Sequence, residues 1–187
     1  NTAEKKAHNV TAQPGESLVL DGDADNSLVL SNGDAYTAYF GWTGKMEVSI
    51  KDAKLYRNIE EAKKDLGDKH WLYENKGALL VLTVDMRNID ALSLDDDERG
   101  WFNISYLGTL QPCEYSYFDG TAEGTSPDGR EDTFFNLPQG QEATYHVGLL
   151  IDDPGSDLSD LWIHAGVNHP YKYRFKLDIE DLRGARS

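Results

Sequence analysis

The feature that most constrains this chain is a strict alternation of apolar and polar residues. Successive side chains of a β-strand point to opposite faces of a sheet, whereas a helix repeats every 3.6 residues. A period of two therefore predicts half-buried strands, each with one face in solvent. The alternation is clearest in the segment YKYRFKLDI, where the apolar positions are Tyr171, Tyr173, Phe175, Leu177 and Ile179.

Four other stretches have the same period: 35–42 (AYTAYFGW), 45–56 (KMEVSIKDAKLY), 78–88 (ALLVLTVDMRN) and 143–152 (ATYHVGLLID). Within 45–56 the apolar phase changes, because Met46, Val48 and Ile50 are followed by Ala53 and Leu55. A phase change inside one strand predicts a β-bulge, here around Lys51 and Asp52.

One segment departs from the period of two. In NIEEAKKDLG, Asn58 can cap the start of a helix, Glu61 stands at the third helical position, and Gly67 can end it. The spacing predicts a short helix over 58–66 between two strands. Its apolar residues recur at helical spacing: Ile59, Ala62 and Leu66.

Many short strands, turns rich in Gly, Asp and Pro, and a single helix predict an all-β fold, an immunoglobulin-like antiparallel β-sandwich with one short inserted helix. The 187 residues suffice for one well-cored domain. We expect residues 1–15 to be a flexible lead-in closed by Pro14 and Gly15, and residues 16–187 to form a single β-sandwich domain.

Charge and cysteine content exclude several classes of function. Acidic residues outnumber basic ones by 33 to 18, which gives a formal net charge of −15. Such a surface repels phosphate backbones and anionic membranes, so nucleic acid is not expected as a partner. No apolar run approaches the roughly 18 residues that span a bilayer. The lone Cys113 excludes an internal disulfide and a multi-cysteine zinc site.

The acidic stretch DGDADN raises the question of a calcium site. Asp21, Asp23 and Asp25 match the first, third and fifth positions of a calcium-loop template. The twelfth position, which should supply a bidentate glutamate, is Asn32, and no helix pattern flanks the loop. A solvated hairpin turn between two strands is the preferred interpretation, and a weak Ca²⁺ site is the alternative; no other cofactor is predicted.

Catalytic motifs are missing. The chain has no G-x-S-x-G, no S-x-x-K and no HExxH-like histidine pair. His146 and His164 lie opposite the apolar phase of their strands, so we expect both to face outward. A second acidic run, LDDDERG at 94–100, is interpreted as an exposed loop. We therefore expect no catalytic residues.

The aromatic residues offer a different kind of site. Ten Tyr, six Phe and four Trp are present, and most fall in phase with an apolar stripe. The best candidates for an exposed contact patch surround irregular segments: Trp101, Tyr115, Tyr117 and Phe118. Ordinary packing in the core is the alternative for these four.

Six motifs together resemble a known bacterial family: GKMEVSIKDAKLY, LLVLTVDMRNIDA (ending in Asn before a loop), FNISYLG, YFDG, FFNLPQGQEATYHVGLLIDDP and LSDLWIHAG. The pattern is similar to the telokin-like, immunoglobulin-like β-sandwich domain of uncharacterised surface lipoproteins of Gram-positive bacteria. It covers about residues 44–166; the helix at 58–66 and the strands in 16–42 and 171–179 are additions to it.

The resemblance implies export and anchoring at the cell surface through a lipidated cysteine upstream of Asn1, and it transfers no functional residues. It leads us to expect a non-enzymatic extracellular module that binds a cell-envelope or extracellular protein. The alternatives are carbohydrate or small-ligand binding through exposed Trp and Tyr, and a hydrolase with an unrecognised site.

Overall fold

The computed structural model describes residues 10–23, 28–29, 35–36, 40–94, 100–109, 113–120, 133–166 and 173–184. Strands account for 54% and helical segments for 8% of it, which confirms the predicted all-β, sandwich-like fold with one inserted helix in the described chain. Within these ranges no helix is long and apolar enough to cross a membrane.

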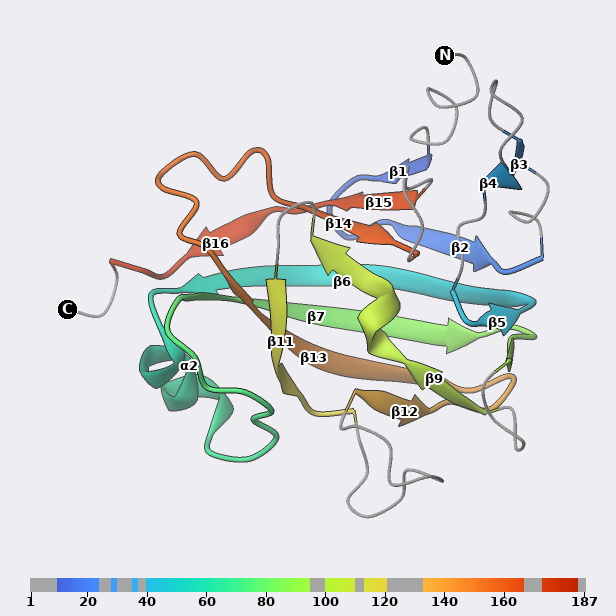
Figure 1. Cartoon of the computed structure of the whole chain (residues 1–187), viewed down its shortest axis with the longest axis horizontal. Coiled ribbons are helices and arrows are strands. Elements are labelled where there is room, and N and C mark those ends of the chain that lie inside the picture. The colour runs from blue at the N-terminus through green and yellow to red at the C-terminus, as the bar shows by residue number, and fades with distance from the viewer. Residues whose placement is uncertain are drawn as a thin grey trace.

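Two sheets enclose the core (Figure 1). The large sheet has the order β11–β13–β7–β6–β16, and β2 also pairs with β6; the small sheet has the order β1–β15–β14–β10. The strands of the large sheet are β2 (Ser17–Asp21), β6 (Lys45–Tyr56), β7 (Ala78–Asn88), β11 (Cys113–Phe118), β13 (Glu142–Ile151) and β16 (Ile179–Asp181). Those of the small sheet are β1 (Val10–Ala12), β10 (Leu107–Thr109), β14 (Trp162–Ala165) and β15 (Tyr173–Lys176).

Shorter elements complete the described chain. Three two-stranded pairs are β9 (Trp101–Asn103) with β12 (Phe134–Asn136), β3 (Leu28–Val29) with β4 (Ala35–Tyr36), and β5 (Trp42–Thr43) with β8 (Leu92–Ser93). The helical segments are α2 (Ile59–Leu66) and the 3₁₀ turn η2 (Ile104–Tyr106).

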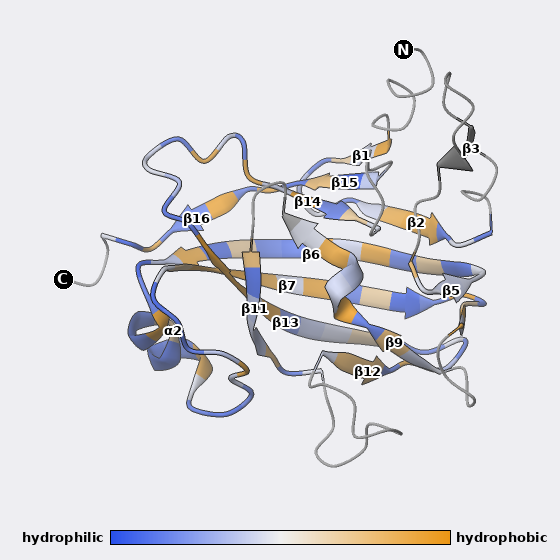
Figure 2. Cartoon of the chain, viewed as in Figure 1, coloured by the Kyte–Doolittle hydropathy of each residue, from blue (hydrophilic) through white to orange (hydrophobic). Residues whose placement is uncertain are grey.

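The alternating strands bury the predicted apolar stripes, and Figure 2 shows the alternation of apolar and polar residues along β6. The small sheet contributes Ile163, Tyr173 and Phe175 to the same core. Burial of these stripes is the main favourable term in the folding of such a sandwich. The large sheet contributes Met46, Val48, Leu80, Leu82, Val84, Met86, Tyr145, Val147, Leu149 and Ile151.

The predicted β-bulge is confirmed. The register between β6 and β7 shifts between Ile50 and Asp52. One extra residue turns the following side chains over, so Ala53 returns to the core while Lys51 and Asp52 are both exposed. The bulge thus places two charged side chains on the outer face of the large sheet.

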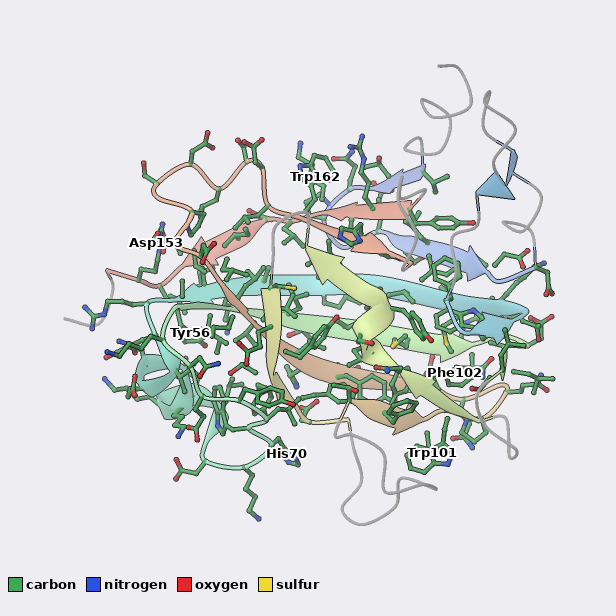
Figure 3. The ribbon with its side chains drawn as sticks, in the orientation of Figure 1. Tyr56, His70, Trp101, Phe102, Asp153 and Trp162 are labelled. Atoms are coloured by element: carbon green, nitrogen blue, oxygen red, sulfur yellow. The ribbon has the colours of Figure 1, made fainter. Side chains whose placement is uncertain are left out.

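The predicted helix is confirmed as α2, cap included. The Asn58 side chain accepts a hydrogen bond from the Glu61 N–H at 2.9 Å, and Gly67 has φ 79° and donates its N–H to the Lys63 carbonyl. The helix packs on the outer face of the large sheet at the end near Tyr56, which Figure 3 shows beside it. The residues of this second core are Tyr56, Ile59, Ala62, Leu79, Val81 and Leu150.

The first and last segments of the described chain each pass from one sheet to the other. β1 pairs with β15 in the small sheet, whereas β2 and β16 both pair with β6 in the large sheet. The stretch 171–179 is therefore not the single strand that its alternation predicts. The chain leaves the small sheet after Lys176 and joins the large sheet at Ile179. The pairings β1–β15 and β16–β6 are parallel, and the other described pairings are antiparallel.

The boundary of the lead-in also needs correction. Val10–Ala12 form β1 and Ala12 is fully buried, so residues 10–15 belong to the sandwich and not to a flexible segment. Residues 1–9 lie outside the described ranges. A three-residue strand carries too little alternation to be recognised in the sequence.

Candidate binding groove on the large sheet

The four aromatic residues predicted to form an exposed patch do not form one. Trp101, Tyr117 and Phe118 are 7%, 4% and 1% exposed. Tyr115 is half-buried, its hydroxyl donates to the Ile104 carbonyl at 3.1 Å, and burial raises its pKa well above the usual value. The prediction of exposure is therefore wrong.

Distant segments cover these rings. Residues 70–72 run along the edge of β11, where the Leu72 N–H donates to the Ser116 carbonyl and the Trp71 ring packs 5.0 Å from that of Tyr117. Phe118 lies in the core against Phe135 and Tyr145. These contacts join residues 17 to 46 positions apart, so the local sequence could not reveal them.

In the described part of the acidic stretch, the aspartate side chains accept hydrogen bonds from backbone N–H groups. The Asp21 side chain accepts the Asp23 N–H at 2.9 Å, and the Asp23 side chain accepts the Gly44 N–H at 3.0 Å. The predicted hairpin is wrong, because β2 pairs with β6 and β3 pairs with β4. Asp25 and residues 95–99 lie outside the described ranges, within which no three His, Cys, Asp or Glu side chains gather around a metal position.

The outer face of the large sheet is divided into two halves. One half is apolar and is covered by α2. The other half is polar, and two rows of facing residues cross it from β2 to β13. The first row is Ser17, Ser49, Asp85 and Thr144; the second is Val19, Glu47, Arg87 and Glu142.

Ion pairs and hydrogen bonds hold the charged side chains of this half in place. Arg87 Nε lies 3.3 Å from Glu47 Oε1, and Lys51 Nζ, set by the bulge, lies 3.6 Å from Asp85 Oδ2. The Thr144 hydroxyl donates to Asp85 Oδ1 at 2.6 Å. Exposed pairs of this kind contribute little stability, but they fix the positions of donors and acceptors across the sheet.

A groove of about 560 Å³ lies over these rows. Its volume falls in the range of small-ligand sites. Exposed Glu142 has no Lys or Arg within 4 Å among the described residues, so it is available to a ligand. The lining side chains are Ser17, Glu47, Ser49, Lys51, Asp85, Met86, Arg87, Glu142, Ala143 and Thr144, with Gly15 at the edge.

A histidine–aspartate pair lies beside the groove but not in its lining. His146 Nδ1 is 2.7 Å from Asp119 Oδ2, and the His146 backbone N–H donates to Asp119 Oδ1. His146 is half-exposed on the outer face, as expected. His164 also lies on the face of its strand opposite the core residues Ile163 and Ala165, as expected, but it is only 7% exposed.

Sequence reasoning did not find the groove. Its residues were visible only as the polar positions of alternating strands, a pattern typical of any solvated sheet face. The one local signal was the bulge, which brings Lys51 onto the face that carries Asp85. The order of strands decides which polar positions become neighbours.

Comparison with protein-family models, with curated proteins and with solved structures found no significant match to this chain.

Proposed function

We propose that this chain is a non-enzymatic interaction module that binds a cell-envelope or extracellular protein through the polar groove of the large sheet. The observation that carries the proposal is the groove itself, about 560 Å³ in volume, whose charged side chains come from three strands. Positive and negative side chains at defined positions favour one specific polar partner over non-specific binding.

The lining indicates what kind of partner would fit. It combines hydroxyl groups, two cations and three carboxylates, and it contains no aromatic side chain. A protein segment with a basic side chain directed at Glu142 satisfies this arrangement. The alternative of carbohydrate binding rested on exposure of the predicted aromatic patch; three of its residues are buried and Tyr115 is half-buried, so this alternative loses its support.

A hydrolytic function finds little support in this surface. The groove has serine hydroxyls, but Ser49 Oγ donates to the Gly15 carbonyl and not to a histidine. The His146–Asp119 pair stands outside the lining. A nucleophile must lie within hydrogen-bond reach of its base, and no described contact joins these groups.

We further propose a location at the cell surface, with the chain held there by a lipid anchor N-terminal to Asn1. The support is the resemblance of residues 44–166 to domains of Gram-positive surface lipoproteins. In such a setting the groove would face other envelope or secreted proteins.

Photo-crosslinking tests the proposal. A crosslinkable amino acid is introduced at Thr144, in the groove, and as a control at Lys64, which is exposed on α2. Each protein is presented to envelope and secreted fractions. We expect one reproducible adduct from position 144 that position 64 does not give.

Matched variants make the result specific. Arg87→Ala and Arg57→Ala each remove one exposed arginine that is paired with one glutamate, but only Arg87 lines the groove. Arg87→Ala should reduce the adduct at least about fivefold, since loss of a charged contact costs about 1–3 kcal/mol. An adduct equally sensitive to Arg57→Ala, or no adduct at all, would refute the proposal.

A further inference from the structure

The outer face of the small sheet carries basic side chains in a strongly acidic protein. The row that crosses this sheet is Thr11, Arg174, His164 and Gly108, and Trp162 faces Lys176 in the next row. None of these six residues is acidic. Figure 3 shows Trp162 on the side of the molecule away from α2.

Arg174 is held by two neighbours. Its guanidinium carbon lies 4.8 Å from the centre of the Trp162 ring, and its Nε donates to Thr11 Oγ1 at 3.1 Å. A guanidinium that lies over an indole and donates from Nε has its orientation fixed, and no hydrogen bond from its two terminal nitrogens to a described residue is present. Lys176 Nζ lies 6.0 Å from the same ring centre, which adds a second positive charge beside the first.

Among the described residues, Arg174 lacks the carboxylate partner that the other arginines have. Of the arginines in the described ranges, Arg57, Arg87 and Arg183 each have a carboxylate within 4 Å, and Arg174 has none. Lys176 also has no described carboxylate at that distance. With 33 acidic residues against 18 basic ones, carboxylates are abundant in this protein, so an arginine with no carboxylate partner among the described residues stands out.

We propose that Arg174 and Lys176 form a second binding site, for the phosphate or sulfate ester of a small soluble ligand. A tetrahedral oxyanion offers several acceptors, which match the N–H groups of the two terminal guanidinium nitrogens and the neighbouring ammonium group. Thr11 and Trp162 act as positioning residues, because they fix the fork and do not need to touch the anion. This site is independent of the groove on the large sheet.

The negative net charge of the protein favours a small anionic ligand over a large one. A net charge of −15 repels polyanions and anionic membranes at long range. At physiological salt the Debye length is about 8 Å, so a small ligand in contact with Arg174 experiences mainly the local positive charge. We therefore commit to a small ester in solution and not to a lipid headgroup.

Titration followed by amide and indole NMR signals tests the site. The probes are glucose 6-phosphate, glucose 6-sulfate and uncharged glucose, added at constant ionic strength. We expect saturable shifts of the Trp162 indole and Arg174 Nε signals with both esters and none with glucose. Arg174→Gln should weaken binding at least about tenfold, since it removes a charge-assisted hydrogen-bonding fork.

Further variants keep the test decisive. Lys176→Gln should weaken binding about two- to fivefold, and it removes no described hydrogen bond, so it serves if Arg174→Gln fails to fold. Thr11→Val should weaken binding less than Arg174→Gln while leaving the charge unchanged. Arg57→Gln and Lys69→Gln are the controls, because they make the same changes at exposed positions outside the small sheet.

Three results would overturn the proposal. The first is shifts that increase linearly without saturation, the second is equal weakening by the control variants, and the third is binding of glucose as tight as that of its esters. Binding to vesicles that contain anionic phospholipid, without binding to the soluble esters, would assign the site to a membrane instead.

Discussion

Asn88 is the residue on which the end of β7 depends. It is fully buried, and its Nδ2 donates to the Ala91 and Leu137 carbonyls at 3.1 and 2.7 Å. Its Oδ1 accepts the Ala91 N–H at 2.7 Å. One amide thus fastens the loop after β7 to the segment that leads into β13, and these two strands carry much of the groove.

Asn88→Ala should lower the free energy of unfolding by about 3 kcal/mol, because it leaves three buried backbone groups without their partner. Urea denaturation measures the loss. Asn75→Ala is the control, since among the described residues that exposed amide bonds only the Glu114 carboxylate, and its removal should cost less than about 0.5 kcal/mol. Equal costs for the two variants would contradict this role of Asn88.

Arg183 strongly lowers the pKa of Asp181, although the two side chains interact near the surface. Hydrogen bonds from the Arg183 side chain and backbone lower the pKa of Asp181 from 3.8 to about 2. Arg183 also contacts Asp153 Oδ1 and the Gly155 carbonyl. The strand β16 is thereby joined to the segment between β13 and β14.

NMR titration of the Asp181 carboxyl should give a pKa of about 2, and Arg183→Gln should return it toward 3.8. Since the folded pKa is depressed, the stabilisation is present above about pH 4 and is lost as the pH falls through about 2. An unchanged Asp181 pKa in Arg183→Gln would show that the depression has another origin.

Among the elements, the crossings between sheets shape the molecule most. β1 turns into β2 at Pro14–Gly15, where Gly15 has φ 80° and its carbonyl accepts the Ser49 hydroxyl. The left-handed region is easily reached by glycine and costs other residues about 1–2 kcal/mol. This turn also forms the edge of the groove.

Gly15→Ala should therefore destabilise the fold by about 1–2 kcal/mol through backbone strain alone, because nothing lies within 4 Å of the added Cβ. Gly184→Ala is the matched control: its Cβ is equally unobstructed and its φ is not positive. Thermal unfolding of both variants is the measurement, and an equal shift in Tm would rule out the strain argument.

Elements defined by local interactions were predicted well. The helix α2 was recognised because its cap, its apolar spacing and its final glycine all lie within ten residues. The bulge was recognised from a phase change within one strand. The break between β15 and β16 was missed, since Leu177 and Ile179 continue the alternation while their backbone changes partner strands.

At the scale of the whole molecule, the excess of carboxylates sets the response to salt. A net charge of −15 places the folded chain under self-repulsion, which compactness increases. The described ion pairs are mostly exposed and therefore weak. Screening by salt should therefore weaken the repulsion among carboxylates more than it weakens the ion pairs, and the folded state should become more stable.

Raising NaCl from about 10 mM to about 0.15 M shortens the Debye length from about 30 to about 8 Å. We expect the Tm at pH 7 to rise by about 2–4 °C, equivalent to about 1 kcal/mol for a chain of this size. Differential scanning calorimetry provides the measurement. A Tm that falls with salt would mean that the ion pairs outweigh the self-repulsion.

The sequence by itself determined the class of fold, the helix and the bulge, because alternation, caps and phase changes depend on residues close together in the chain. Only the tertiary structure decided that Trp101, Tyr117 and Phe118 are buried, and that four polar positions of β2, β6, β7 and β13 become neighbours. Burial and adjacency in a sheet depend on which strands pair. That choice is made by packing between segments far apart in the sequence, which no local pattern records.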